Sequence, residues 1–469
     1  MATGRNLVWV GVAAVVVLGL GGLVVFGGST GSDNGRPTPR AVPKGSATAV
    51  TVKPAPPVRS LEERVVTAAP FERPVAPEGA PNVVLVVLSA ARKDQLSPYG
   101  AAAGVTPFLA RVAGKGARFL DTIADAPSPR AASAAMLTGR HSWHIGIPEP
   151  GPEASARTLP DDVQQLSEHF RRAGWTTLGA TGNHNLNQDP LDGPSHGGIG
   201  RGFDKHLNAQ ERGFAPGRRQ GAGFIVTEAL KMVDERPAAD RPVYLQLNLI
   251  DTNAPVRVIE EQLGDFEPDR PNAPYRAALN RIDGQLERLW KELGDRGLTD
   301  NTFLVVVADH GEGLDTPAHH GTFHGRLLYE SSVAVPWIVV GPGVKPNQLV
   351  GGLAAGVDVA PTVLDLAGLP VPEGLDGMSH ASLLRGDGAR TQREKTWSAT
   401  WQFTAKRASS WTSSRQCQLD FGSTDISDSF VDACYDRRTD PAFTRVVEDR
   451  EAMDALNTWA AEVDAALTE

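Results

Sequence analysis

Apolar residues along this chain recur in two patterns, as unbroken runs of strand length and as stripes with helical spacing. Val83–Leu88 reads VVLVVL and Phe303–Val307 reads FLVVV, and such runs are typical of strands buried on both faces of a parallel sheet. Residues 274–293 place leucine and isoleucine on one stripe, which predicts an amphipathic helix. We expect further strands at 176–180, 243–250 and 337–340, and further helices at 106–114, 160–173, 224–233, 357–367 and 449–467.

The predicted strands alternate with the predicted helices. This order predicts an α/β fold with a mostly parallel central sheet. Ligands of such sheets bind beyond the carboxyl ends of the strands. The residues that directly follow the apolar runs are therefore the first candidates for a site, and they are Ser89, Asp251, Asp309 and His310.

The apolar run nearest the N-terminus indicates a membrane anchor. Leu7–Phe26 holds 20 residues without a charge, enough to cross a bilayer core of about 30 Å. Arg5 precedes the run, so we expect a single-pass helix with a short cytoplasmic tip and a soluble part that is periplasmic or extracellular. A cleaved signal peptide is the alternative. Residues 29–80 are rich in proline, glycine and serine, which predicts an extended linker outside the fold.

Charge and cysteine content exclude several classes of function. The formal net charge is -9, so the basic surface of a nucleic-acid-binding protein is absent and we expect no nucleic-acid partner. The chain has two cysteines, Cys417 and Cys434. This number excludes a four-cysteine zinc site and an all-cysteine iron–sulfur cluster within one chain. The pair forms either one disulfide in an oxidising compartment or two separate buried thiols.

Histidines gather after the second long apolar run. Asp309 and His310 follow FLVVVA directly, and His319, His320 and His324 come soon after. A carboxylate and imidazoles at a strand end are suitable ligands for a divalent metal. The alternative is structural, with Asp309 capping a helix and the histidines lining a solvated loop.

Several longer stretches, in this order, resemble the sulfatase family of the alkaline-phosphatase superfamily. They include PNVVLVVLSAARKDQLSPYG, MLTGRHSWHIGI, NTFLVVVADHGE and LLYESSVAVPWIVVGPG. The resemblance is to a divergent, membrane-anchored, bacterial-type member, and it implies a metal-dependent hydrolase of sulfuric or phosphoric esters. It also implies an alkaline-phosphatase-like sandwich. The expected organisation is an anchor at 1–28, a linker at 29–80, a catalytic-type domain at 81–385 and a small C-terminal α+β subdomain at 386–469.

The chain departs from the family pattern where catalysis takes place. The family usually has a metal-binding aspartate directly after its first strand, and Ser89 stands there. Neutral hydroxyls are weaker ligands for hard cations than carboxylates. Counted back from Thr138, the position of the formylglycine nucleophile falls on Pro129 and that of its arginine on Ser133. We therefore expect no formylglycine. Asn253 replaces a histidine that the family often has.

The remaining residues define a candidate site that contains possible metal ligands and possible catalytic residues. The resemblance implies one divalent metal at most (Zn, Mn, Ca or Mg), held by Asp309, His310, Asp251 and His320. The candidate catalytic residues are Ser128, Ser133, Arg92 and His324. Arg92 either faces the anion or forms a surface ion pair.

Three functions are compatible with this pattern. In the first, the protein is a weak or inactive sulfatase-family member, a pseudoenzyme that binds a sulfated or phosphorylated ester or glycan, or a partner at the cell envelope. In the second, it is an active hydrolase with a rearranged site, in which Ser128, Ser133 or a metal-bound water attacks the ester. In the third, it is a structural envelope protein without a ligand.

Overall fold

The computed structural model describes residues 65–67, 72–147, 159–183, 186, 201–208, 221–256, 263, 266, 272–314, 323–401, 405–423, 431–440 and 443–468. The predicted membrane helix at Leu7–Phe26 lies outside these ranges, and so do His319 and His320. Within them, none of the helices combines the length and the apolar character of a membrane span.

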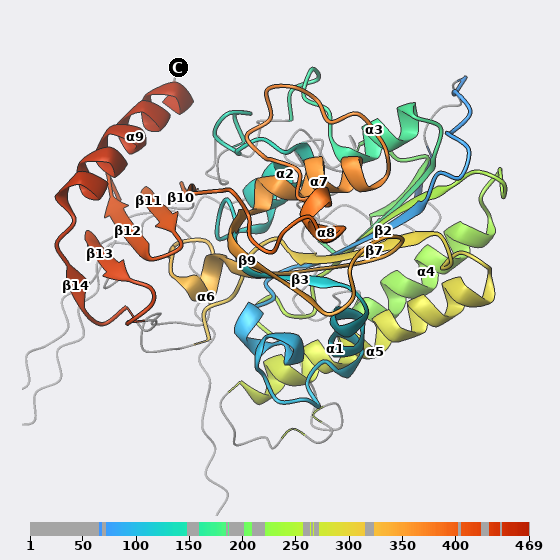
Figure 1. Cartoon of the computed structure of the whole chain (residues 1–469), viewed down its shortest axis with the longest axis horizontal. Coiled ribbons are helices and arrows are strands. Elements are labelled where there is room, and N and C mark those ends of the chain that lie inside the picture. Colours follow the sequence, from blue (N-terminus) through green and yellow to red (C-terminus); the bar gives the residue numbers. More distant parts are fainter. Residues whose placement is uncertain are drawn as a thin grey trace, which may run out of the picture. The chain divides into compact units, whose positions relative to one another are not determined.

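Nine strands of the described residues form a central sheet in the order β1-β5-β4-β6-β2-β7-β8-β3-β9 (Figure 1). Strands β5, β4, β6, β2 and β7 run parallel to one another, as predicted, and β8 is antiparallel to both of its neighbours. Their bounds are Val65–Thr67 (β1), Asn82–Leu88 (β2), Ala117–Ile123 (β3), Thr176–Thr181 (β4), Lys205–Asn208 (β5), Val243–Leu249 (β6), Thr302–Ala308 (β7), Ala334–Val340 (β8) and Gln348–Ala355 (β9).

Strand β1 corrects the predicted linker at 29–80. Residues 65–67 pair antiparallel with β5 at the edge of the central sheet. Arg73 then forms an ion pair with Asp204, and its Nη1 also donates to the carbonyl of Trp175 at 3.1 Å. A short β-branched segment can satisfy an exposed strand edge, so the C-terminal part of the predicted linker belongs to the fold.

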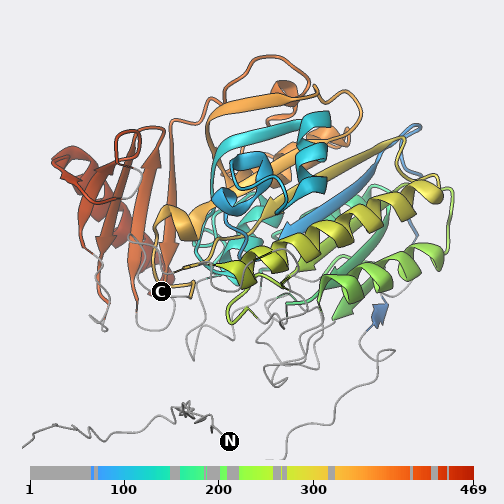
Figure 2. The same ribbon diagram turned by 90° about the horizontal axis from the view of Figure 1, so that it is seen from below.

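Helices cover both faces of the central sheet. One face packs against α1 (Pro107–Lys115), α4 (Ala222–Asp234) and α5 (Ala273–Asp295), and the last two lie side by side (Figure 2). The other face packs against α2, α3, α7 and α8. Their bounds are Pro129–Thr138 (α2), Leu166–Arg172 (α3), Val359–Leu366 (α7) and Ala381–Leu384 (α8), while α6 (Glu330–Val333) leads into β8; 3-10 turns span Lys93–Gln95, Ser97–Tyr99 and Gly356–Asp358.

The apolar runs and stripes predicted most of these elements. The long strands β2, β6 and β7 and the helices α1, α4, α5 and α7 lie where they were expected, whereas the helix expected at 160–173 is confirmed only as α3. The pattern gave no indication of α2, whose sequence PRAASAAMLT is buried at every position. A helix that is buried all round has no polar stripe, so periodicity does not reveal it.

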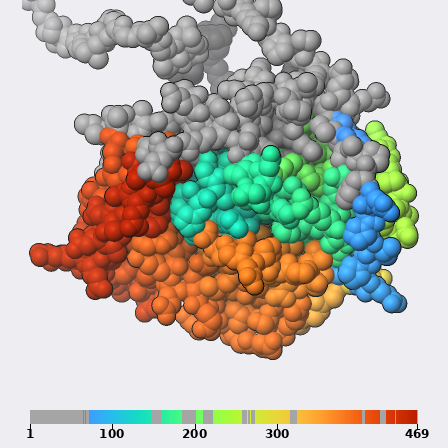
Figure 3. Space-filling view, turned by 90° about the horizontal axis from the view of Figure 1, so that it is seen from above, coloured from blue at the N-terminus to red at the C-terminus, as the bar shows by residue number. Residues whose placement is uncertain are grey.

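A second, antiparallel sheet follows in the order β10-β11-β12-β13-β14. Its bounds are Lys395–Thr400, Arg407–Thr412, Arg415–Asp420, Ala433–Asp436 and Val446–Val447, and the helix α9 (Arg450–Thr468) packs on it. Cys417 and Cys434 face each other on β12 and β13 and form a disulfide. Helix α9, in red in Figure 3, lies beside the teal surface of the main domain, where Trp459 meets Trp143 edge to face.

Candidate functional site

Three neighbouring parallel strands end at the same edge of the central sheet. Strand β2 lies between β6 and β7, so the residues that follow these strands share one edge. They are Ser89 after β2, Asp251 close behind β6 and Asp309 after β7. Ligands of parallel sheets bind beyond this edge, so these residues remain the first candidates for a site.

Asp309 is the centre of a buried hydrogen-bond network. Its Oδ2 accepts from the hydroxyl of Ser89 at 3.0 Å, and Ser133 Oγ lies 3.5 Å from the same oxygen. Its Oδ1 accepts from the backbone N–H groups of Ala90 at 3.2 Å and His310 at 2.8 Å. Burial raises the pKa of Asp309 to about 7, against the effect of these hydrogen bonds. Burial therefore favours the protonated, neutral form of this carboxyl group.

The backbone of Ala90 is strained at this point. Its φ is 61°, in the left-handed region that costs roughly 1–2 kcal/mol for a residue with a Cβ. The Ala90 carbonyl accepts from the hydroxyl of Tyr275 at 2.6 Å, and the hydroxyl of Thr252 donates to the Ser89 carbonyl at 2.6 Å. Hydrogen bonds from α5 and from the segment after β6 thus hold the turn that carries Ser89.

Helix α2 brings two serines to this edge. Ser128 occupies its N-cap position and Pro129 its first turn, where the missing N–H of proline costs no helical hydrogen bond. The side chain of Ser128 is fully buried, and its Oγ has no hydrogen-bond partner in the described part of the chain. Ser133 lies farther along the same helix and reaches Asp309. The structure therefore brings Ser133, but not Ser128, into reach of that carboxyl.

Two histidines and a glutamate form the other side of the network. The rings of His310 and His324 lie 4.4 Å apart, and His324 Nδ1 lies 3.0 Å from Glu312 Oε2. Burial lowers the pKa of His310 well below its ordinary value. Its Nε2 is buried, makes no hydrogen bond, and lies 3.6 Å from Asp309 Oδ1.

Sequence reasoning missed Glu312, which is fully buried. Its Oε2 also accepts from the N–H of Ala254 at 2.9 Å, so it connects the segment after β6 with His324. The signal was present, because Glu312 lies three residues beyond Asp309 in the same strand-end motif.

The C-terminal sheet positions the segment that carries His324. Side chains of its strands donate to three backbone carbonyls between residues 325 and 328. Thr400 Oγ1 bonds the Gly325 carbonyl at 2.5 Å, Arg407 Nη1 that of Arg326 at 3.0 Å and Gln416 Nε2 that of Leu328 at 2.7 Å. The second sheet therefore supports the site although it contributes no side chain to the network described above.

Comparisons with known proteins agree with this geometry. A family model described as Sulfatase matches residues 81–369, and one described as N-sulphoglucosamine sulphohydrolase, C-terminal, matches residues 318–463. The chain belongs to the sulfatase family. Its fold is the α/β sulfatase fold, with a mostly parallel central sheet and a C-terminal antiparallel sheet.

The similar sulfatases differ in how much of each chain they match. The N-acetylgalactosamine-6-sulfatase of Canis lupus familiaris is 25% identical over 362 residues, which cover 67% of each chain. The extracellular sulfatase SULF-1 homolog of Drosophila melanogaster is 37% identical over 107 residues, 23% of this chain and 9% of that protein. The match to arylsulfatase K of Canis lupus familiaris likewise covers only 19% of that protein.

Solved structures share the fold at low sequence identity. BT4656, in complex with its substrate D-glucosamine-2-N,6-O-disulfate, has a TM-score of 0.63 at 19% identity, over 83% of this chain and 98% of that one. The phosphonate monoester hydrolase of Agrobacterium radiobacter has a TM-score of 0.65 at 19% identity, over 82% of this chain and 95% of that one.

Arg92 of this sulfatase-family chain is engaged in an ion pair. Its guanidinium donates to both oxygens of Asp94 at 2.9 and 2.8 Å, and Nη1 lies 3.4 Å from the Glu312 carbonyl oxygen. Burial opposes ionisation of Asp94, but Arg92 lowers the pKa of that carboxyl below its ordinary value. Of the two roles expected for Arg92, the ion pair is the one that the structure contains.

Asp251 has other partners than Asp309. It accepts from the N–H of Ala222 at the start of α4 at 3.0 Å, and it lies 3.4 Å from Nη2 of Arg281. Burial raises its pKa, which Arg281 opposes. The predicted grouping of Asp251 with Asp309 and His310 around one metal is therefore not found in the described residues, because Asp251 binds the start of α4.

Sulfatases generally use a metal ion, and the side chains of the site can be compared with the ligands that such an ion needs. A hard divalent cation binds several anionic oxygens. In the described part of the chain, no three Asp, Glu, His or Cys side chains come together as a metal site. Both oxygens of Asp309 already accept hydrogen bonds, and the neighbouring donor after β2 is the neutral Ser89. The described residues therefore do not fit this metal, while His320 lies outside them.

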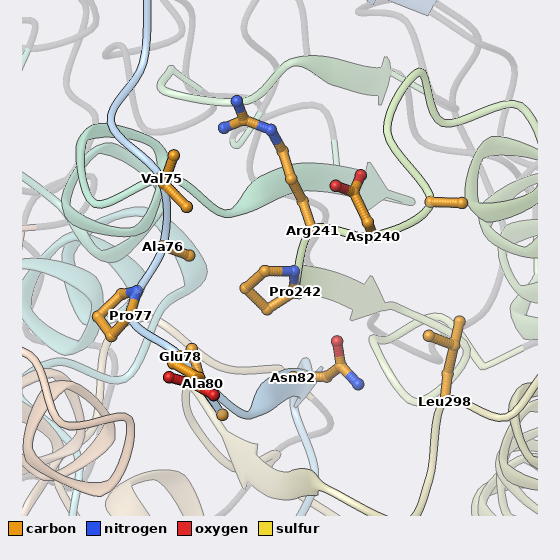
Figure 4. Close-up of a pocket in the computed structure, with 12 residues that line it drawn as sticks. Val75, Ala76, Pro77, Glu78, Ala80, Asn82, Asp240, Arg241, Pro242 and Leu298 are labelled. Carbon is orange, nitrogen blue, oxygen red and sulfur yellow. The ribbon is translucent and has the colours of Figure 1, made fainter.

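A cavity of about 430 Å³ lies elsewhere, at the amino ends of the strands (Figure 4). Asn82 at the start of β2 and Pro242 just before β6 line it, together with Arg241, Asp240 and the segment 75–80. Because strands β2 and β6 end at the opposite edge, this cavity is separate from the network around Asp309.

Proposed function

We propose that this sulfatase-family chain binds a sulfated or phosphorylated ester or glycan and hydrolyses it weakly or not at all. The observation that carries the proposal concerns Asp309, which stands where the family binds a metal. Its carboxyl oxygens accept hydrogen bonds from Ser89, Ala90 and His310 instead. The nucleophile position holds Pro129. Loss of either part commonly lowers the rate by several orders of magnitude, whereas the fold and its strand-end site remain.

The start of α2 is where we place the anionic group of the ligand. A helix N-terminus presents free N–H groups and a partial positive charge, which favour oxyanions. Ser128 adds a buried hydroxyl that is not used by the cap itself. The relatives support the choice of ligand, because N-acetylgalactosamine-6-sulfatase and the BT4656 complex are both named for sulfated amino sugars.

A second candidate function is hydrolysis through Ser133. Its Oγ lies 3.5 Å from Asp309 Oδ2, close to the distance at which a carboxylate accepts a proton from a nucleophile. Ser133 Oγ would bond to the sulfur or phosphorus of the ester, its proton would pass to Asp309, and the alcohol would leave with a proton from His324. Water would then cleave the ester on Ser133, Asp309 would return its proton to Oγ, His324 would take a proton from the water, and hydrogen sulfate or hydrogen phosphate would leave. The metal-bound-water alternative has less support, because the described donors do not fit a metal.

Binding and turnover of the full-length chain separate these two functions. We would titrate N-acetylglucosamine 6-sulfate by calorimetry and follow hydrolysis of 4-nitrophenyl sulfate and 4-nitrophenyl phosphate. Saturable binding with no turnover above that of a Ser133→Ala variant supports the binding function. Turnover that Ser133→Ala abolishes, with binding retained, would instead establish the hydrolase. Absence of binding to any sulfated probe would refute both.

We also propose that the protein acts at the cell envelope. The disulfide between Cys417 and Cys434 is typical of an oxidising compartment, and Leu7–Phe26 has the length and composition of a membrane anchor. The full-length chain should sediment with membranes and resist carbonate extraction, whereas a chain that begins at residue 29 should not. A shortened chain in the soluble fraction, without Leu7–Phe26, would contradict the anchor and favour a cleaved signal peptide.

A further inference from the structure

Strand β6 carries a buried carboxamide whose two polar atoms make no hydrogen bond. Asn248 is 2% exposed, and neither its Oδ1 nor its Nδ2 has a hydrogen-bond partner among the residues that the structure describes. Among the described residues it is the only side chain with two such atoms. Buried amides are nearly always paired, because an unpaired buried donor or acceptor loses its interactions with water without compensation. An amide kept unpaired in the protein therefore calls for a functional explanation.

The register of the sheet places Asn248 beside the candidate site. It lies opposite Val87 of β2 on one side and Thr181 of β4 on the other, so these side chains share one face. Val87 belongs to the core that packs against α2, the helix that carries Ser128 and Ser133. Ser89 follows Val87 by two residues, so it lies roughly 8 Å from Asn248, one strand spacing across and two residues along.

The side chains in register with Asn248 are uncharged. Its register neighbours are Val87 and Thr181, and Thr181 uses its hydroxyl to donate to the Asn183 carbonyl at 3.2 Å. The next polar side chain on the same strand and face, Gln246, accepts from the hydroxyl of Tyr244 at 2.7 Å. A carboxamide in such a setting offers to a neutral group an NH₂ group that donates and a carbonyl oxygen that accepts, and it has no charge to balance a sulfate.

We infer that Asn248 forms a second subsite, which binds an uncharged sugar substituent with both a donor and an acceptor beside the ester group at α2. An acetamido group and a ring hydroxyl share this chemistry. The inference rests on the proposed function, since it names the part of the sulfated sugar that is recognised next to the anion.

The test uses the full-length chain and the variant Asn248→Leu, with Asn248→Val in reserve if the leucine does not fit. Thr396→Val is the matched control, because Thr396 Oγ1 is likewise buried and unpaired but lies on β10 of the second sheet. Urea unfolding would be measured without ligand. Calorimetry would use N-acetylglucosamine 6-sulfate, glucose 6-sulfate and inorganic sulfate as probes.

We expect Asn248→Leu to be as stable as the parent chain or more so, because it removes two unpaired polar atoms. Its affinity should fall about tenfold or more for the sugar sulfates but stay unchanged for inorganic sulfate. A loss confined to the acetamido sugar would identify that group, and an equal loss for both sugars would identify a hydroxyl. Thr396→Val should change no affinity.

An Asn248→Leu chain that binds the sugar probes as the parent chain does would overturn the subsite. If that chain is also less stable than the parent chain, the amide belongs to the internal packing of the fold. In both cases sulfate binding by the parent chain would leave the proposed function standing. A parent chain that binds no sulfated probe would refute the proposed function and the subsite together.

Discussion

Replacement of Asp309 by asparagine should stabilise this protein at alkaline pH. Burial raises the pKa of Asp309 from 3.8 to about 7 in the folded chain, so the folded state binds this proton more tightly than the unfolded state does. Stability is therefore lost as the pH rises from about 4 to about 7. At about 1.4 kcal/mol for each tenfold difference in proton affinity, the carboxyl costs about 4 kcal/mol at pH 8 but less than about 1 kcal/mol at pH 4.

Asp309→Asn removes this cost while it keeps the shape of the side chain. The amide oxygen can still accept from the N–H groups of Ala90 and His310, and its NH₂ can donate to the hydroxyl of Ser89. We therefore expect the variant to gain about 4 kcal/mol in its free energy of unfolding at pH 8 and little at pH 4.

Urea unfolding of both chains at pH 4, 6 and 8 measures this gain. Asp234→Asn is a suitable control, because that side chain is about half exposed in its ion pair with Arg296 and such pairs contribute roughly 0–1 kcal/mol. A variant that is less stable than the parent chain at pH 8, or a gain that does not change with pH, would refute the reasoning.

The other predictions concern stability and covalent state. Asp358 accepts a hydrogen bond from Arg393 in the core. Burial opposes ionisation of this carboxyl, but His380 and Arg393 lower its pKa to about 2. Asp358→Asn should therefore lower the free energy of unfolding by about 3–5 kcal/mol at pH 7, and urea unfolding should show this difference shrinking as the pH falls from about 4 to about 2. Replacing Cys417 and Cys434 by serine should cost about 3 kcal/mol in urea unfolding, since the disulfide closes a loop of 17 residues. Mass spectrometry of the peptide that contains Ser128 should find an unmodified serine.

Each of these predictions would be contradicted by a specific result. An Asp358→Asn effect that is equal at all pH values would mean that the carboxylate does not carry the pH dependence. Unchanged stability without the disulfide would mean that the unfolded chain gains nothing from the loss of this constraint. A peptide lighter by two hydrogen atoms would mean that Ser128 is oxidised to formylglycine.

The sequence predicted the strands that build the site better than it predicted the site. Continuous apolar runs gave β2, β6 and β7, because strands buried on both faces need no polar position. The strand-end rule then selected Ser89 and Asp309, which are hydrogen-bonded in the structure. Asp251 shows the limit of this rule, since a strand end fixes an edge of the sheet but not the direction of a side chain. Asp251 binds the N-terminus of α4 instead.

The amino-acid sequence by itself determined the α/β fold, the family and the two substitutions that separate this chain from the family pattern, Ser89 and Pro129. These follow from local runs and from residue identities at fixed spacing. Tertiary structure alone decided that Ser133 reaches Asp309, that Glu312 meets His324, and that Asn248 remains unpaired beside the site. Those contacts join segments brought together by packing, and hydrogen bonding in a buried site depends on the positions of both partners, which a single segment of sequence does not specify.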